Sequence, residues 1–280
     1  MAIATGNPEF DYGTTARIQI RPVTPSAGFP AFAGDDANCI KYCLYLINCL
    51  RALIFLLHHL LMFIGHFGVG FGAKTVAPTV SLGTLFLAAQ FLDLLWPSLL
   101  LLGVETVRIE PGATVVTPLV FEHYPVSHSL IAVLGWAVLV GAMHFVLLRQ
   151  RIAALVLAGL VVSHWVLDAI VHQPDLPLFP GSAAVVGLNL WSSLASTLLV
   201  ESALFALGVW LYACATTPSN AVGRWGLVAL VIFLAGVYAG NLFGAPPPSP
   251  EAIAWIGQLQ WLLVLWGYWI DKHRHVAVRA

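Results

Sequence analysis

The chain has 280 residues, of which 59% are hydrophobic and only 9% are charged. Ordinary soluble domains carry about 25% charged residues, so the composition excludes a water-soluble globular domain and indicates one polytopic helical bundle in a membrane. The formal net charge of -1, without a long basic or acidic run, gives no reason to expect nucleic acid as a partner.

The chain divides into four predicted parts. Residues 1–38 contain Gly, Pro and Thr without helical or strand periodicity, which predicts a disordered leader. Residues 39–61 predict an interfacial helix or an extension of the first span. Residues 62–271 are expected to form the transmembrane bundle, and residues 272–280 a basic cytoplasmic tail.

From residue 39 onward, apolar residues fall into blocks of about 20, the length that an α-helix needs to cross about 30 Å of hydrocarbon. The expected fold is therefore all-α, a polytopic transmembrane helical bundle of six or seven spans. The predicted spans cover residues 51–73, 82–103, 126–148, 152–171, 188–214, 226–243 and 253–270.

Basic residues in the connectors indicate the orientation of the bundle. With seven spans, one side of the membrane would hold Lys74, Arg149, Arg151, Arg224, Lys272, Arg274 and Arg279. The short loops on the opposite side hold only Arg108. The positive-inside rule then places the C-terminus in the cytoplasm and the long connectors 104–125 and 172–187 over the outer mouth. Basic residues in and beside the leader do not fit this orientation, which leaves open six spans preceded by a re-entrant or half-length helix.

The stretch VSHWVLDAIVHQPD, residues 162–175, carries the clearest chemical pattern. Its His164, Asp168 and His172 stand four residues apart, so on a helix they share one face. Imidazole and carboxylate groups that converge in this way form half of a metal site. The structural alternative is a hydrogen-bonded pair of His164 and Asp168 that holds two helices together, and His172 has the further alternative of facing water.

Acids inside the other predicted spans extend the pattern. An ionisable residue inside a span costs about 2.5 kcal/mol or more, and the acids there have no deep Lys or Arg to neutralise them. A divalent metal would balance this charge, and mixed His and Asp ligation suits Zn²⁺, with Mn²⁺ or Fe²⁺ as alternatives. Such a metal polarises a phosphoryl or carbonyl oxygen and lowers the pKa of a bound water to about 7, which indicates hydrolysis. The predicted ligands are His66, Asp93, His128, His164 and Asp168.

Two further residues are candidates for catalysis. Glu201, midway along its span, and His172 would each serve as a second-metal ligand or a general base. For Glu201, a protonated acid bonded to a neighbouring helix remains an alternative. Ser127 is expected to cap the helix that follows Pro125, and His123 is expected to be a solvated loop residue.

Four segments of the chain together resemble a known family. GHFGVGFGAK, AAQFLDLLWP, YPVSHSL and SHWVLDAIVHQPDLPLFPG, within residues 62–212, are similar to the bacterial membrane-bound metal-dependent hydrolases. The family pattern has a His on the first helix, an (S/T)HS triplet and H-x-x-x-D on a later helix. These elements match His66, residues 127–129, and His164 with Asp168, and Asp93 fits the acid between them. The ligand order also resembles that of zinc-dependent phospholipase C.

The resemblance implies an integral-membrane, metal-dependent hydrolase in a bacterial-type inner or plasma membrane. Its expected partners are the lipid bilayer and a lipid-like or small-molecule substrate, cleaved at a phosphoester or related bond. The alternative is a proton- or cation-coupled transporter that uses Asp93, Asp168 and Glu201, although the chain lacks internal repeats and paired Gly/Pro-broken spans. The sequence leaves the oligomeric state open.

Overall fold

The structure is a computed structural model that describes residues 64–277. The predicted leader over residues 1–38 and the predicted interfacial helix over residues 39–61 lie outside the described residues. So do residues 51–63 of the first predicted span and the end of the basic tail.

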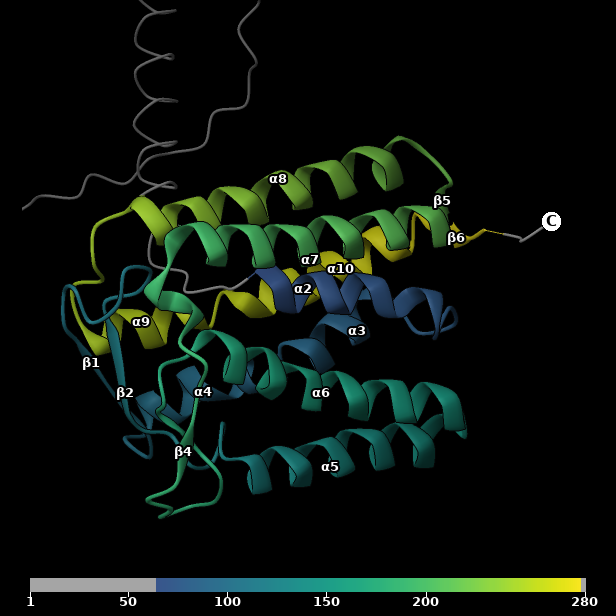
Figure 1. Cartoon of the computed structure of the whole chain (residues 1–280). Helices are drawn as coiled ribbons and strands as arrows, with labels where there is room; N and C mark the ends of the chain where they lie inside the picture. Colours follow the sequence, from purple (N-terminus) through teal and green to yellow (C-terminus); the bar gives the residue numbers. More distant parts are fainter. Residues whose placement is uncertain (1–63, 278–280) are drawn as a thin grey trace, which may run out of the picture. The chain divides into compact units, whose positions relative to one another are not determined.

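The described part is mostly helical, as predicted (Figure 1). The helices are α2 (Ile64–Gly72), α3 (Leu82–Ala89), α4 (Phe91–Leu101), α5 (Leu130–Leu148), α6 (Arg151–Val171), α7 (Leu194–Ala215), α8 (Ala221–Phe243), α9 (Pro250–Gly257) and α10 (Gln260–Asp271), with the 3-10 turns η1 (Ala73–Thr75) and η2 (Leu190–Ser192). The short strands are β1 (Thr106–Ile109), β2 (Leu119–His123), β3 (Leu176–Pro177), β4 (Val185–Val186), β5 (Thr216–Pro218) and β6 (Arg274–Val276).

Several helices have the length and apolar character of membrane spans. Within residues 64–277 these are α5, α6, α7, α8 and the stretch Pro250–Asp271, which makes five. The bent pair of α3 and α4 would make a sixth if it is counted as one span. These helices fit an integral membrane protein, whereas the predicted number of six or seven spans is not confirmed.

The prediction of one continuous helix over residues 82–103 is wrong. The chain breaks at Gln90, whose backbone (φ -104°, ψ 12°) leaves the helical conformation, and α3 and α4 meet there at 58°. Neither Pro nor Gly stands at the break, so local sequence does not signal it. The last predicted span, residues 253–270, lies within the candidate span Pro250–Asp271, which consists of α9 and α10. At the end of α9, Gly257 packs so closely on α4 that a side chain there would collide with Pro97.

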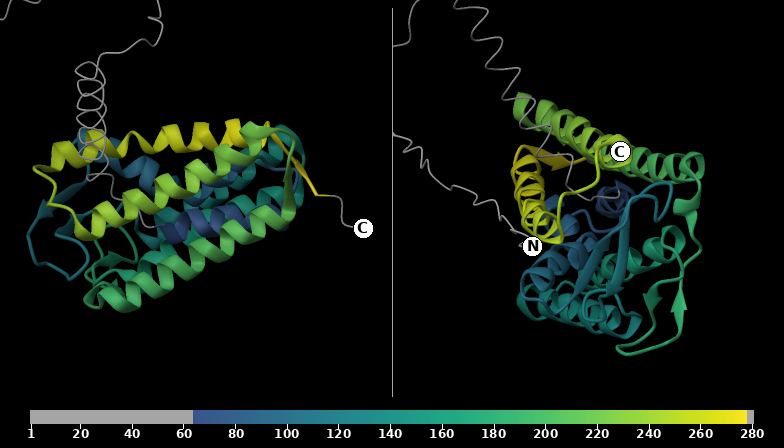
Figure 2. Two further views of the ribbon diagram at one scale, coloured as in Figure 1. Left: turned by 90° about the horizontal axis from the view of Figure 1, so that it is seen from above. Right: turned by 90° about the vertical axis from the view of Figure 1, so that its left-hand side faces the viewer.

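The long connectors contain β-structure that the all-α prediction did not include. Strands β1 and β2 form an antiparallel hairpin in which Arg108 pairs with Val120, and β3 pairs with β4 in the next long connector. Both pairs lie at the same end of the bundle, which Figure 2 shows facing the viewer in its right-hand panel. Two apolar clusters hold the helices together, one that includes Phe67, Leu230 and Leu263 and one that includes Leu85, Val133 and Leu157.

Helix α2 runs through the middle of the helices (Figures 1 and 2). Nearly all of its residues are buried, and the rings of Phe67 and Phe71 pack edge-on against Phe86 of α3. Gly68 and Gly208 let α2 and α7 approach so closely that a methyl group on either residue would collide with the opposite backbone. This packing fixes the position of His66, which α2 carries inward.

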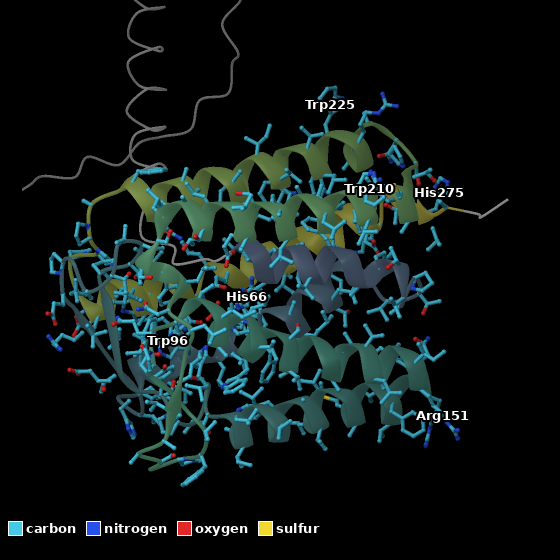
Figure 3. The ribbon with its side chains drawn as sticks, viewed as in Figure 1. His66, Trp96, Arg151, Trp210, Trp225 and His275 are labelled. Carbon is cyan, nitrogen blue, oxygen red and sulfur yellow. The ribbon has the colours of Figure 1, made fainter. Side chains whose placement is uncertain are left out.

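The opposite end of the bundle carries the basic connectors. Figure 3 shows Arg151 and His275 at this end, away from Trp96 at the strand end. Here the buried Lys74 forms an ion pair with Asp271 at 2.9 Å, and the hydroxyl of Tyr212 donates to the same carboxylate. The basic residues of the described part therefore share this end, apart from Arg108 on β1 at the strand end, and this is the distribution that the sequence predicts.

Candidate metal centre

The five predicted ligands come together from four places in the fold. His66 lies on α2 and Asp93 in the first turn of α4. His128 lies in the turn before α5, and His164 and Asp168 share the buried face of α6. Two overlapping groups of side chains place their ligand atoms within 4.8 Å of one another: His66, His164 and Asp168, and Asp93, His128 and His164.

The ring of His164 is oriented by the break between α3 and α4. Its Nδ1 lies 2.7 Å from the carbonyl oxygen of Ala89, which is the last residue of α3. The last carbonyl groups of a helix lack partners within the helix, so this oxygen can accept a hydrogen bond from a side chain. A carbonyl only accepts, so Nδ1 carries the proton and the Nε2 of neutral His164 presents a lone pair.

The ring of His128 is oriented by a chain of two short hydrogen bonds. The hydroxyl of Ser127 donates to Glu105 Oε2 at 2.6 Å and lies 2.6 Å from His128 Nδ1. Because the hydroxyl proton is directed at the carboxylate, the serine oxygen accepts the Nδ1 proton of His128. Burial lowers the pKa of His128 to about 4, so this imidazole is neutral at pH 7 and its Nε2 also presents a lone pair.

With both imidazoles neutral, four acceptor atoms face one another. His164 Nε2 lies 3.4 Å from Asp168 Oδ2 and 3.5 Å from Asp93 Oδ1. His128 Nε2 lies 3.6 Å and 3.8 Å from the same two oxygens. Within residues 64–277, His164 Nε2 and Asp168 Oδ2 are buried and have no hydrogen-bond partner.

These separations suit a shared cation better than direct pairing. Charge-assisted hydrogen bonds between nitrogen and a carboxylate are about 2.7–2.9 Å long, which is shorter than all four distances. Ligands about 2.0–2.1 Å from a tetrahedral Zn²⁺ lie about 3.3–3.4 Å apart. Since no Lys or Arg of the described part pairs with Asp93 or Asp168, a divalent ion would also balance their charge.

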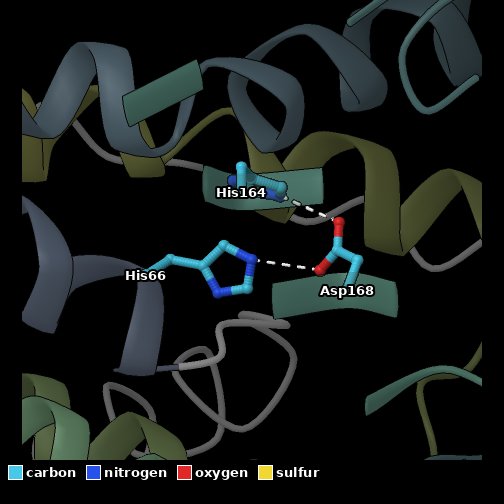
Figure 4. A group of neighbouring side chains, drawn as sticks. All are labelled: His66, His164 and Asp168. Carbon is cyan, nitrogen blue, oxygen red and sulfur yellow. Dashed lines mark hydrogen bonds and ion pairs between the residues drawn. The ribbon is translucent and has the colours of Figure 1, made fainter. Parts of the chain in front are cut away.

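Figure 4 shows His66 and His164 at the two different oxygens of the Asp168 carboxylate. Its Nε2 is 3.0 Å from Asp168 Oδ1, so in this arrangement Nε2 carries a proton and donates it to the carboxylate. The rings of His66 and His164 have their centroids 3.9 Å apart. The prediction that His66 is a ligand stays a prediction, and its geometry equally suits a residue that orients Asp168.

A cavity of about 30 Å³ lies beside the cluster. This is room for about one or two water molecules. The acids Asp93 and Asp168 and the imidazole of His128 line it, together with Trp96 and Gln260 from the helices. The β1–β2 hairpin and the turn before β2 close the cavity with Thr117, Leu119 and Phe121.

His172 also lines this cavity and is buried, so the alternative that it faces water is wrong. Its Nδ1 is 3.0 Å from Asp175 Oδ1, which also accepts the hydroxyl proton of Tyr124 at 2.9 Å. Burial, followed by the charge of Asp175, raises the pKa of Tyr124, so the phenol stays protonated and donates. Asp175 thus holds His172 with its Nδ1 protonated.

Glu201 does not join the cluster. It is buried on α7, and its Oε2 accepts the backbone N–H of Gly65 at 2.7 Å. Among the described residues it belongs neither to the two candidate metal-binding groups nor to the cavity lining. Gly65 is required there, because a Cβ would lie 2.9 Å from the carboxylate oxygen. Glu201 therefore holds α2 just before His66.

The role predicted for Ser127 is wrong. Ser129 caps α5, because its hydroxyl accepts the N–H of Ala132 and stands directly before the first apolar residue of the helix. Ser127 instead bonds Glu105 and His128. Glu105 lies in the predicted outer connector 104–125, and nothing in the sequence GVETV distinguishes it as a buried partner of the cluster. His123 is exposed, as expected.

The comparisons with known proteins add no relatives. No protein-family model, curated protein or solved structure matches the chain. The function is therefore inferred from the geometry of the residues themselves.

Proposed function

We propose that this chain is an integral-membrane, metal-dependent hydrolase that holds a single Zn²⁺ between His128, His164, Asp93 and Asp168. The observation that carries the proposal is the convergence of four acceptor atoms at 3.4–3.8 Å. His66 would orient Asp168 through its hydrogen bond to Oδ1. The bound ion would supply Lewis-acid polarisation of a phosphoryl or carbonyl oxygen and a more acidic water.

His172 is the candidate general base in this proposal. It lines the cavity next to Asp93, His128 and Asp168, and the protonation of its Nδ1 leaves Nε2 as the atom that would take a proton. Asp175 fixes that tautomer, in the manner of a carboxylate that orients a catalytic imidazole. Glu201 contacts no atom of the cavity, so we propose that it positions α2.

The substrate class follows from the location of the site. The cluster lies toward the strand end, among helices that are apolar enough to lie in lipid, which favours a lipid-like phosphoester. The basic residues gather at the other end, so the positive-inside rule would place that end in the cytoplasm and the site in the outer half of the membrane.

Metal analysis of the purified protein tests the proposal. We expect wild-type protein, purified in detergent with micromolar Zn²⁺, to hold one zinc per chain, and Asp168→Asn to hold none. Asp271→Asn is the matched control, because it removes the charge of a partly buried aspartate at the opposite end and should leave the zinc content unchanged. Retention of metal by Asp168→Asn, or its absence from the wild type, would contradict the site.

An activity measurement tests the reaction itself. The zinc-loaded protein should release nitrophenolate from bis(p-nitrophenyl) phosphate in micelles, and chelation should abolish the release. If the wild-type protein binds zinc but hydrolyses neither this ester nor a short-chain phospholipid, the proposed metal site is supported and the proposed hydrolase activity is contradicted. Cation-dependent uptake into vesicles would then favour the transporter alternative.

A further inference from the structure

We propose that Glu105, acting through the hydroxyl of Ser127, sets the tautomer of His128 and thereby makes Nε2 available to the metal. The inference rests on the proposed function, since it concerns a ligand of the proposed zinc site. Glu105 would be a positioning residue, because it touches neither the metal position nor the cavity.

The carboxylate of Glu105 is a buried hydrogen-bond acceptor with three donors. It is buried, and its Oε1 accepts the backbone N–H groups of Val126 and Ser127, each at 2.8 Å. Its Oε2 accepts the hydroxyl of Ser127 at 2.6 Å. All three donors come from the segment that leads directly into His128, so the carboxylate holds this turn at three points.

The direction of the hydrogen bonds is the central point. A carboxylate offers no proton, so Ser127 must donate toward Glu105 and can only accept from His128. The Nδ1 of neutral His128 is then protonated and Nε2 is not. Outer partners of this kind fix the orientation and tautomer of metal-binding imidazoles. His164 reaches the same state through a backbone carbonyl, so both imidazoles are prepared before a metal arrives.

A single substitution reverses the direction of the hydrogen bonds that link Glu105, Ser127 and His128, while the side chain keeps its size. In Glu105→Gln the amide oxygen can still accept the two backbone N–H groups, but the amide nitrogen then faces the serine and donates to it. Ser127 would turn its own proton toward His128 Nδ1, which forces the proton of His128 onto Nε2. The variant therefore separates tautomer control from simple packing.

The test measures the tautomer directly, in metal-free protein at pH 8. Protein labelled with ¹⁵N-histidine in micelles reports which ring nitrogen carries the proton, and the signal lost in His128→Asn assigns the residue. We expect a protonated Nδ1 in the wild type and a protonated Nε2 in Glu105→Gln. Glu122→Gln, the same change at an exposed position of the same hairpin, should match the wild type.

Zinc affinity, measured by competition with a chelator, is the second readout. Loss of an outer partner costs about 10- to 100-fold in metal affinity, and we expect this loss in Glu105→Gln but not in Glu122→Gln. A folded Glu105→Gln with a protonated Nδ1 and wild-type affinity would overturn the proposal. If that variant fails to fold, a protonated Nε2 in metal-free wild type still overturns it. The tautomer stands apart from the proposed function, since it is read without metal or substrate.

Discussion

His164 on α6 donates through Nδ1 to the carbonyl oxygen of Ala89, 2.7 Å away at the end of α3. The bond ties the orientation of one proposed ligand to a break in another helix. The same break begins α4 and so places Asp93 within 3.5 Å of His164 Nε2. A continuous helix over this stretch would engage the carbonyl and move the carboxylate.

The first prediction concerns His164 itself. His164→Ala should lower zinc affinity by about 100-fold or more, since it removes a ligand rather than an outer partner. Added imidazole should restore part of the binding, because the truncation leaves a space of matching shape and chemistry. Competition with a chelator measures both effects. His144→Ala, a histidine of α5 outside the cluster, is the control and should bind zinc as the wild type does.

The second prediction asks whether Asp175 acts through the hydrogen bonds that it accepts or through its negative charge. Tyr124 and His172 both bond the same oxygen, Oδ1, which Asp175→Asn can keep and Asp175→Ala cannot. General acid–base catalysis contributes about 10² to 10⁴ in rate. We expect kcat for bis(p-nitrophenyl) phosphate to fall about 10- to 100-fold in Asp175→Ala and less in Asp175→Asn. KM and zinc content should stay unchanged, and a loss of zinc in either variant would show a structural role instead.

The third prediction concerns stability at the basic end. Lys74→Met would leave the partly buried Asp271 without its cation, and breaking a fully buried pair costs about 3–5 kcal/mol, which is the upper limit here because the Asp271 side chain is 16% exposed. The midpoint of thermal unfolding in micelles should fall clearly. The double variant Lys74→Met with Asp271→Leu should recover most of it, because no buried charge is then left unpaired. Equal midpoints for the single and double variants would contradict this account.

The fourth prediction is a pH dependence that arises from Glu105. Burial raises the pKa of Glu105 above its ordinary value, although hydrogen bonds from Ser127 and Val126 oppose the shift. A raised folded-state pKa means that the folded protein binds the proton more tightly than the unfolded chain. The stability from this group is therefore fully present below about pH 4.3, the unfolded value, and is lost as pH rises through the folded pKa.

The measurement compares metal-free wild type with Glu105→Gln, whose side chain does not titrate. The difference in unfolding midpoint, wild type minus variant, should decrease as pH rises from 4 to 8. His123 is the nearby charge that acts on Glu105, and His123→Gln should steepen the decrease, because it removes a charge that lowers the pKa of Glu105. A difference that grows with pH would contradict the raised pKa.

The helices and the cluster could be predicted from the sequence for different physical reasons. Apolar blocks of span length mark α5 to α8 because lipid-facing helices need such blocks. His164 and Asp168 could be placed on one face because helical periodicity fixes it. His128 and Asp93 were expected nearby because buried carboxylates without Lys or Arg need imidazoles or a metal.

Other features depend on contacts that no local pattern encodes. Gln90 is an ordinary helical residue by itself, and the break there is supported by His164, 74 residues later in the sequence. Glu105 differs from the exposed acids Glu110 and Glu122 only in what packs around it. The cap at Ser129 could have been predicted from the sequence, because the residue directly before the first apolar position is the expected cap.

The break at Gln90 also bears on how the protein enters its membrane. Helices α3 and α4 have 8 and 11 residues, and neither approaches the roughly 20 residues that a spanning helix needs. They would have to cross as one unit, and the carbonyl oxygen of Ala89 at the bend has its donor, His164, only when α6 is packed against them. Completion of the bend and assembly of the ligand cluster would therefore depend on the same contact.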